Sequence, residues 1–348
     1  MNADRFEAIT GQYRRLRVAV VGDFCLDRYL EIDPARSEIS IETGLPVCNV
    51  AHVRAQPGGA GTVLNNLVAL GVGEIYPVSF AGEDGEGYEL GRALAAKPGV
   101  RLDYFLQTPD RHTFTYCKPL VLEPGKSPRE LNRLDQKNWS PTPQALSARL
   151  SQAVLAVAEK VDAFMLLGQV DVAETGVLTT PVLETLGGIA RSKPERWILA
   201  DSRRGLRDFP PVVFKMNAAE LAALTGTEPS SALADIASVA TDLARRNGRP
   251  VFVTLAERGI VAAAPGGQWE HSPSLPVRGE IDIVGAGDSV SANLITALAA
   301  GASLREAMDL ANAAASIVVH QLGTTGSASV AQLRELFVGG SKIGRAHV

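Results

Sequence analysis

Short apolar segments alternate with helix-length amphipathic segments along most of this chain, and this alternation narrows the folds it can adopt. Residues 18–21 (Val-Ala-Val-Val) are apolar and mostly β-branched, and they are followed by Gly22-Asp23, which is typical of a buried parallel strand. Further strands are expected at 75–80, 163–167, 197–200 and 251–255, a hairpin at 260–264 and 269–271, and helices at 62–70, 87–96, 143–158, 175–191, 218–225, 232–246, 286–300 and 304–321. This order predicts an α/β fold with a doubly wound, mainly parallel sheet flanked by helices.

Two stretches, at about 27–55 and 112–135, lack this pattern. Both contain short alternating segments and no helical period, so we expect them to form a small, half-exposed β-sheet inserted into the larger domain as a lid. The expected organisation is a single domain over residues 1–338 that carries this lid. A chain of 348 residues would also accommodate two smaller domains.

Composition limits the partners and the compartment. A net charge of −4 argues against a general nucleic-acid binder, and no apolar run approaches the length of a membrane span. The three cysteines are odd in number and lack metal-ligand spacing, and residues 1–17 contain no secretory signal. We therefore expect a cytoplasmic protein that acts on small molecules.

The end of the chain needs a separate interpretation. Residues 342–348 match what one reading frame of a widely used sequencing adapter encodes before a stop codon. We interpret residues 339–348 as a non-native tail, and an ordinary frayed terminus is the alternative. Under the first interpretation, a further domain beyond about residue 341 is compatible with the sequence.

The segment Gly285-Ala286-Gly287-Asp288 stands where a polar stretch ends and a long apolar helix is expected to begin. Glycines there let successive backbone N–H groups turn toward one point, where the helix dipole also favours an anion. An adjacent carboxylate suits phosphoryl transfer, because the attacking hydroxyl must lose a proton while the phosphoryl oxygens need fixed donors. We expect Asp288 to be the catalytic base and the backbone amides of Gly285, Ala286, Gly287 and Asp288 to hold the phosphoryl group.

A simpler interpretation of this segment is a capped helix N-terminus. Two common phosphate loops are excluded, because the chain has no Gly-x-x-x-x-Gly-Lys-Ser/Thr and no Gly-x-Gly-x-x-Gly after its first strand. The second absence also argues against a dinucleotide-dependent dehydrogenase built on the same kind of sheet.

Two segments resemble the signatures of the ribokinase-like, or PfkB, carbohydrate kinases. Residues 282–288 (Asp-Ile-Val-Gly-Ala-Gly-Asp) are similar to the C-terminal signature, and residues 57–71, which begin Pro-Gly-Gly-Ala-Gly-Thr, are similar to the N-terminal one. They lie in the expected order, and the resemblance spans roughly residues 18–323. It implies a ribokinase-like fold with a β-sheet lid and ATP-dependent phosphorylation of a sugar hydroxyl.

The resemblance also implies roles for residues on the sugar side. Asp23 and Asp27 match a first-strand site that binds sugar hydroxyls, and Gly58, Gly59 and Thr62 belong to the N-terminal signature. A carboxylate such as Asp27 can accept hydrogen bonds from a vicinal diol, while a turn cap is the alternative.

On the nucleotide side, the resemblance implies one set of ATP-binding residues. These are Asn217, Glu220, Thr254, Ala256, Gly259 and Asn312. Glu220 of the Asn-x-x-Glu element would act on Mg²⁺ through water, which suits a cation that keeps most of its waters. Helix-surface roles are the alternatives for Glu220 and Asn312. Asp282 matches a residue near a monovalent cation site, here K⁺, although Ile283 stands where Thr is common.

Parts of the expected lid resemble the heptose 7-phosphate kinases of the ADP-heptose pathway. The matching segments are residues 22–29, 39–42, 46–47 and 132–135. A substrate that already carries a phosphate needs cations, which Arg111, Lys118 and Arg133 would supply unless they are ordinary surface charges. The chain departs from the expected pattern at Thr62, at residues 167–171 and at residues 201–204, so the sugar itself stays open.

Two other functions are alternatives to this one: a degenerate sensor of the same fold, and a kinase for a different sugar or nucleoside. The intact Gly285, Gly287 and Asp288 favour turnover, because a sensor has no use for a base. A homodimer through the lid is a further hypothesis, since a small exposed sheet has edges and an apolar face to cover.

Overall fold

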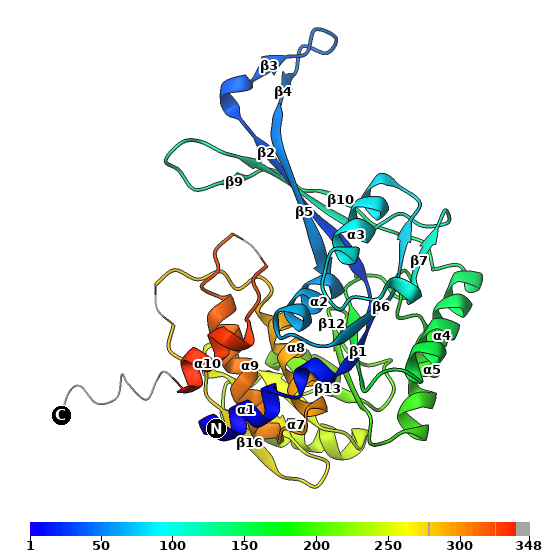
Figure 1. Ribbon diagram of the computed structural model, residues 1–348, viewed down its shortest axis with the longest axis vertical. Coiled ribbons are helices and arrows are strands. Elements are labelled where there is room, and N and C mark those ends of the chain that lie inside the picture. The colour runs from blue at the N-terminus through cyan, green and yellow to red at the C-terminus, as the bar shows by residue number, and fades with distance from the viewer. Residues whose placement is uncertain (278, 324, 339–348) are drawn as a thin grey trace, which may run out of the picture.

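The body of the molecule is built on a nine-stranded sheet with the order β16-β15-β14-β13-β12-β11-β1-β6-β7 (Figure 1). The computed structural model describes residues 1–277, 279–323 and 325–338. The strands are β1 (Arg17–Gly22), β6 (Glu74–Gly82), β7 (Phe105–Thr108), β11 (Ala163–Gly168), β12 (Trp197–Ser202), β13 (Val213–Asn217), β14 (Val251–Thr254), β15 (Ile260–Ala263) and β16 (Trp269–Ser272). Neighbours are parallel except in the β14/β15 and β15/β16 pairs, so the predicted sheet and its hairpin are confirmed.

The direction of winding reverses at β1, which lies between β6 and β11. From β1 the chain adds β6 and β7 on one side, then crosses back and adds β11 to β14 on the other. Ligands of open α/β sheets bind beyond the carboxyl ends of the strands at such a reversal. The fold therefore directs attention to the segments that follow β1 and β11.

Helices cover both faces of the sheet. They are α1 (Ala3–Thr10), α2 (Ala60–Ala69), α3 (Gly85–Ala95), α4 (Gln144–Ala158), α5 (Thr180–Ser192), α6 (Ala218–Thr225), α7 (Leu233–Asn247), α8 (Ala286–Ala299), α9 (Leu304–Val318) and α10 (Val330–Val338), with short 3₁₀ turns at Tyr13–Arg15, Pro34–Arg36, Leu102–Tyr104 and Ala256–Arg258. One core contains α1 to α3 and α8 to α10, and the other contains α4 to α7. Helix α8 is buried without interruption over residues 289–298, so its N-terminus is held firmly.

The lid is a second sheet that projects from the body as a narrow arm (Figure 1). It contains β2 (Phe24–Ile32), β5 (Val50–Gly59), β8 (Thr115–Val121), β9 (Arg129–Glu130) and β10 (Leu134–Gln136), and the short hairpin β3 (Glu38–Ile39) and β4 (Pro46–Val47) forms its tip. The strand order is β10-β8-β2-β5, with β9 paired to β8. The predicted lid is confirmed, and its long strand β5 leads directly from the arm into the start of α2.

The structure differs from the sequence-based expectations in a few elements. Strand β13 was missed because Lys215 interrupts its apolar run, and α1, β7 and α10 were not predicted either. Helix α5 begins at Thr180 rather than at residue 175, because the preceding residues form a loop and Pro181 favours the first helical turn. The interpreted tail at 339–348 lies outside the described residues. Within the described residues, no helix is long and apolar enough to cross a membrane.

Candidate active site

Two cavities meet at the N-terminus of α8. One is a groove of about 530 Å³ whose lining includes Ala286 and Gly287, and the other is a polar pocket of about 150 Å³ whose lining includes Gly285 and Asp288. The four residues of the predicted anion turn therefore divide between the two cavities. A phosphoryl group held at this turn can face both of them.

The backbone of this turn has the conformation that the sequence predicted. Gly285 has φ of +81°, in the left-handed region that favours glycine, and it precedes the first helical residue. The first turn of a helix leaves backbone N–H groups without intrahelical partners, and the helix dipole makes this end electropositive. Together these features are typical of an anion site.

Asp288 lies in the first turn of α8, partly buried beside two other charged residues. Burial and the neighbouring Asp201 carboxylate raise the pKa of Asp288 to about 7, while Lys215 opposes that rise. Lys215 and Asp201 form a buried ion pair of 2.7 Å, and Ser291 Oγ donates to the same Asp201 oxygen at 2.9 Å. A carboxylate with a pKa near 7 can exchange protons at neutral pH.

Lys215 is the residue in this network that the sequence did not point to. Burial opposes the charged form of Lys215, but Asp201 outweighs it and raises the lysine pKa. A Cβ added to Gly287 would lie 3.3 Å from Lys215 Nζ, which places the ammonium group directly against the glycine turn. A lysine inside an otherwise apolar strand was the available signal, because buried lysines are rare unless they are paired.

The polar pocket brings together residues from distant parts of the chain. Its lining consists of Asp27, Gly59, Thr62, Tyr116, Lys118, Arg133, Gln169, Arg203, Val284, Gly285, Asp288 and Thr325. Asp27 and Lys118 face each other at 3.3 Å, with only 8% and 15% of their side chains exposed. Burial raises the pKa of Asp27, and Lys118 opposes that rise.

The double glycine between β5 and α2 allows this pocket to form. A Cβ on Gly58 would lie 2.5 Å from Asp27 Oδ2, and one on Gly59 would lie 2.6 Å from the backbone oxygen of Asp23. Gly59 also has φ of +57°. Gly58 thus lies directly beside Asp27, although it does not line the pocket itself.

Arg133 and Arg203 add positive charge to the polar pocket. The Arg133 guanidinium stacks on Tyr116 at 5.1 Å from the ring centre, and burial raises the pKa of that tyrosine to about 12. Arg203, Tyr116, Gln169 and Thr325 were not among the residues predicted from sequence. No local motif marks them, because they come from separate parts of the chain and meet only in the fold. Tyr116 lies in β8, Gln169 and Arg203 directly follow β11 and β12, and Thr325 comes after α9.

Two residues predicted for substrate binding lie elsewhere. The Asp23 carboxylate is buried and accepts hydrogen bonds from the backbone N–H groups of Gln169, Val170 and Val177, so it ties the end of β1 to the loop after β11. Arg111 is also buried, and its guanidinium donates to backbone oxygens that include those of Ser140 and Thr175. Neither side chain lines the polar pocket, because each is occupied in holding loops of the body.

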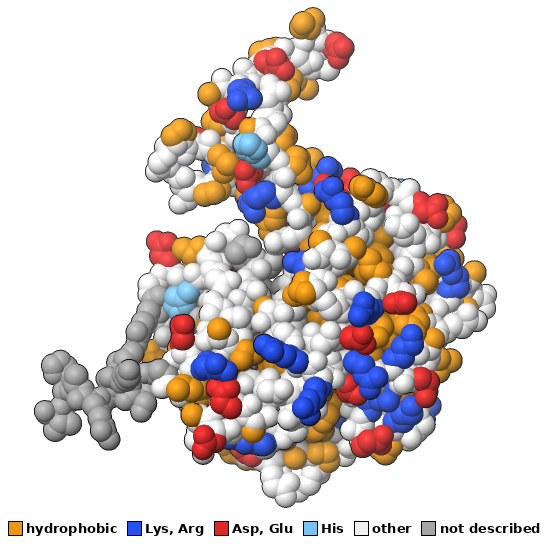
Figure 2. Space-filling model, in the orientation of Figure 1, with side chains coloured by type: hydrophobic (Ala, Val, Ile, Leu, Met, Phe, Trp, Pro, Cys, Tyr) orange, Lys and Arg blue, Asp and Glu red, His pale blue; other side chains and the backbone are white. Residues whose placement is uncertain are grey.

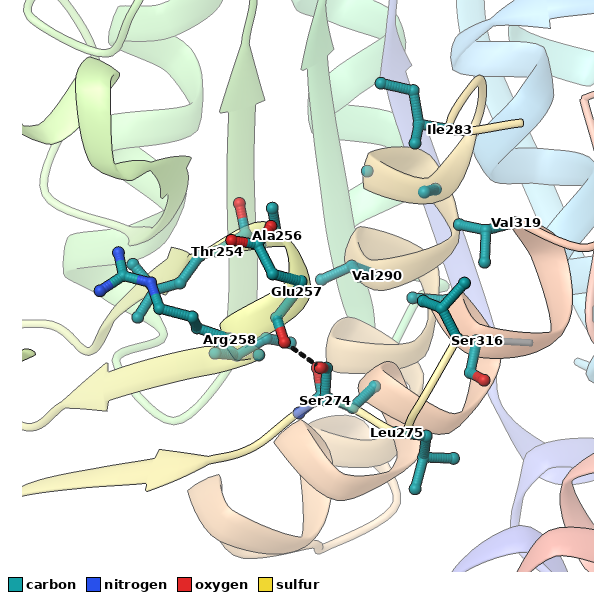
Figure 3. Close-up of a pocket in the computed structure, with 18 of the residues that line it drawn as sticks. Thr254, Ala256, Glu257, Arg258, Ser274, Leu275, Ile283, Val290, Ser316 and Val319 are labelled. Carbon is teal, nitrogen blue, oxygen red and sulfur yellow. Dashed lines mark hydrogen bonds between the residues drawn. The ribbon is translucent and has the colours of Figure 1, made fainter. Parts of the chain in front are cut away.

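The groove on the other side of α8 is mainly apolar. Figure 3 shows Thr254, Ala256, Glu257 and Arg258 on one wall and Ile283, Val290 and Val319 on the other. Ser274 Oγ donates to the backbone oxygen of Glu257 and so holds the segment after β16 against the first wall (Figure 3). A long, mostly apolar groove that ends at an anion turn has the form needed for a planar base followed by phosphates.

The predicted nucleotide residues divide between the groove lining and its supports. Asn217, Thr254, Ala256, Gly259 and Asn312 line the groove. The Asn312 side-chain amide donates to Ser272 O and Oγ, at 2.9 and 3.0 Å, so it anchors the chain after β16 against α9. Ala256 has an unusual φ of +52°, which marks a strained turn at the groove.

Asn217 and Glu220 form a capping box at the start of α6. Glu220 Oε2 accepts from the Asn217 backbone N–H at 2.7 Å, and Asn217 Oδ1 accepts from the Glu220 backbone N–H at 2.9 Å. Within the described residues, no cluster of three or more acidic, His or Cys side chains is suited to hold a metal ion. A Mg²⁺ that keeps most of its waters and binds substrate phosphates fits this arrangement, because it needs few protein ligands.

Asp282 holds the turn that precedes α8. Its two carboxylate oxygens accept from the backbone N–H groups of Val284 and Gly323, at 3.0 and 3.2 Å. The side chain thus joins the segment before α8 to the segment after α9. Its predicted place beside a monovalent cation stays a prediction.

The fold and the paired cavities define a class of protein: a sugar kinase with a doubly wound body and a β-sheet lid. A family model described as pfkB family carbohydrate kinase matches residues 16–331, and the chain therefore belongs to that family. It is a carbohydrate kinase, and ATP is the phosphoryl donor of such enzymes.

Curated relatives extend the comparison. The chain is 33% identical over 308 residues to the bifunctional protein HldE of Azorhizobium caulinodans. This match covers 88% of this chain and 61% of that protein. It is 31% identical over 331 residues to the bifunctional protein HldE of a Bradyrhizobium species, covering 94% and 65%. The chain therefore spans a little over three fifths of the length of these relatives.

Solved structures confirm the fold. Ribokinase from Arabidopsis thaliana, complexed with ribose and ATP, superposes with a TM-score of 0.66 at 18% identity, covering 93% of this chain and 99% of that one. Phosphofructokinase-2 from Escherichia coli, in complex with potassium, gives a TM-score of 0.69 at 19% identity, covering 94% and 99%. Both likenesses support the ribokinase-like architecture.

Proposed function

We propose that this kinase phosphorylates a hydroxyl of a sugar phosphate similar to heptose 7-phosphate, with Asp288 as the general base. The observation that carries the proposal is the position of the α8 N-terminus, which separates an apolar groove from a polar pocket and exposes Asp288 to the pocket. ATP in the groove would place its terminal phosphate at the glycine turn. A sugar in the pocket would present its hydroxyl to Asp288.

The chemistry follows from these positions. Asp288 would take the proton of the attacking hydroxyl, and a pKa of about 7 leaves a substantial fraction of the carboxylate ionised at neutral pH. The backbone N–H groups of Gly285, Ala286 and Gly287, with Lys215 beneath them, would hold the transferred phosphoryl group. Mg²⁺, organised through water near Glu220, would supply charge neutralisation for the ATP phosphates.

The sugar side supports the proposed substrate in two ways. Asp27 and Lys118 are a buried, opposed pair that can accept from and donate to adjacent hydroxyls. The likeness to the bifunctional proteins HldE agrees with the lid segments that resemble heptose 7-phosphate kinases. The matches cover 61% and 65% of those relatives, so the proposal concerns only the kinase reaction and not the further activity of the bifunctional proteins.

Two subsidiary proposals concern ions and assembly. We propose that a K⁺ ion binds near Asp282, since the structurally similar phosphofructokinase-2 was solved in complex with potassium. We also propose a homodimer through the lid, because the arm exposes hydrophobic side chains along its length (Figure 2). Ile41 is fully exposed at the tip, and Leu134 is 65% exposed. A monomer in light scattering at micromolar concentration would contradict the dimer.

The test is ADP release with ATP, Mg²⁺ and a panel of sugars and sugar phosphates, for the wild type and Asp288→Asn. We expect the variant to lose about 10³-fold or more in kcat, with little change in ATP binding. Equal ADP release by the two proteins would exclude Asp288 as the base. Sugar-independent binding of ATP without any turnover would instead support a sensor.

The melting temperature of Asp288→Asn provides a control for correct folding, because the direction of its change can be predicted. The pKa of Asp288 is raised in the folded protein, so folding binds a proton between about pH 4 and 7 and stability falls as the pH rises through that range. Asp288→Asn removes this penalty and is expected to melt at a higher temperature than the wild type at pH 8. A lower melting temperature would show that lost activity reflects misfolding.

A further inference from the structure

The rim of the polar pocket carries more positive than negative side chains. The charged residues of its lining are three cations, Lys118, Arg133 and Arg203, and two carboxylates, Asp27 and Asp288. Lys118 pairs with Asp27 at 3.3 Å, Arg133 pairs with Asp135, and Arg203 pairs with Asp171 at 3.6 Å. The positive side chains of the lining therefore outnumber the negative ones, which favours an anionic ligand.

Arg203 is the cation of the lining with the longest ion pair. Among the described residues its ion-pair partner is Asp171, whose other oxygen is already held by Lys137 at the shorter distance. The Arg203 side chain is 57% exposed, so it can move toward a ligand without first losing a buried contact. Its backbone is held, because Arg203 N donates to Gly168 O at 2.9 Å.

Arg203 and Arg133 reach the pocket from different parts of the molecule. Arg203 follows β12 of the body, while Arg133 precedes β10 of the lid and stacks on Tyr116. Both line the pocket that also contains Asp288. Two guanidinium groups from opposite elements can bind one phosphate by several charge-assisted hydrogen bonds.

We propose that Arg203 is a specificity-determining residue that, together with Arg133, binds the phosphate already present on the sugar substrate. The inference rests on the proposed function and deepens it: Arg203 takes the place in the cationic grip that the sequence suggested for Arg111. The pair would select sugars with a terminal phosphate over free sugars. Because Arg133 belongs to the lid and Arg203 to the body, the same phosphate would also hold the lid against the body.

The experiment compares matched substrates in wild type, Arg203→Met and Arg204→Met. The substrates are a heptose 7-phosphate with the free heptose, and fructose 6-phosphate with fructose, assayed by ADP release. We expect Arg203→Met to lose about 10- to 100-fold in kcat/KM for the phosphorylated sugar that is turned over, with little change for the free sugar. Arg204→Met removes the adjacent exposed arginine, which does not line the pocket, and should keep the wild-type preference.

Binding provides a readout that does not need turnover. Calorimetry without nucleotide should show a weaker affinity of Arg203→Met for the sugar phosphate, by a similar factor, with Arg204→Met unchanged. Equal affinity of wild type and Arg203→Met would overturn the inference, and so would a wild type that binds no sugar phosphate. An equal loss of kcat/KM for free and phosphorylated sugars would also overturn it, because it would indicate contact with the transferred phosphoryl group.

Different results would contradict the proposed kinase reaction and the proposed role of Arg203. A wild type that phosphorylates free sugars as well as their phosphates keeps the kinase function and removes the role of Arg203. A wild type that binds a sugar phosphate through Arg203 but never releases ADP keeps the Arg203 site and removes the proposed reaction.

Discussion

The groove and the polar pocket lie on opposite sides of one helix N-terminus, yet the chain builds them in different ways. The groove is lined by residues 217–319, all from the C-terminal part of the chain, and much of its surface is apolar. The smaller polar pocket draws side chains from positions between 27 and 325, from both the lid and the body. The groove is therefore built from one part of the sequence, whereas the pocket is built from residues that are far apart in the sequence.

This difference suits two kinds of ligand. The groove offers shape, apolar contact and backbone amides, which suit a cofactor common to many kinases. The pocket offers charged side chains in buried or shared pairs, which suit the polar sugar proposed above. Substitutions in the two halves should therefore separate ATP binding from sugar recognition.

Among substitutions that compare the groove with the pocket, the largest effect is expected from Asp27→Asn in the pocket. Loss of the charge leaves buried Lys118 without its partner and weakens acceptance of sugar hydroxyls, so kcat/KM for the sugar should fall by about 10²-fold or more. The KM for ATP should change less than about threefold. Glu31→Gln, farther out on β2, is the matched control, and an equal effect in both variants would contradict a specific role for Asp27.

A smaller effect, on ATP and not on the sugar, is expected from Ala315→Leu in the groove. The larger side chain would occupy space in the groove, so the KM for ATP should rise about 10-fold while the affinity for sugar measured by calorimetry stays the same. A melting temperature within a few degrees of the wild type would establish that the core is intact. Equal losses on both substrates would break the separation between groove and pocket.

The smallest effect concerns the helix terminus that the two cavities share. With Asp288 as the proposed base, its ionised form is the active one, so kcat/KM should rise with pH up to about 7 and then level off. Asp201→Asn removes a charge that raises the Asp288 pKa and leaves Lys215 to lower it, so the rise should move to lower pH. Asp162→Asn on the surface serves as control, and a shift to higher pH in Asp201→Asn would contradict the assignment of the base.

Much of the fold could be predicted because its signals are local. Helix α6 was predicted with both ends correct, and α4, α7, α8 and α9 within a few residues, since each has an apolar face and a terminal signal. Strand β13 was not predicted, because its central Lys215 looks like a surface charge in the sequence and is stabilised by Asp201 from a different strand. A charge whose partner is distant in sequence cannot be distinguished from a surface charge.

The sequence by itself determined the alternating α/β architecture, the inserted lid and the glycine turn before α8, because these depend on periodicity and on backbone freedom at particular residues. Only the tertiary structure decided which charges meet. It placed Asp23 and Arg111 among loop-holding contacts, joined Lys215 to Asp201, and brought Arg203 to the rim of the pocket. The physical reason is that an ion pair depends on distance in space, and strands far apart in the chain set that distance.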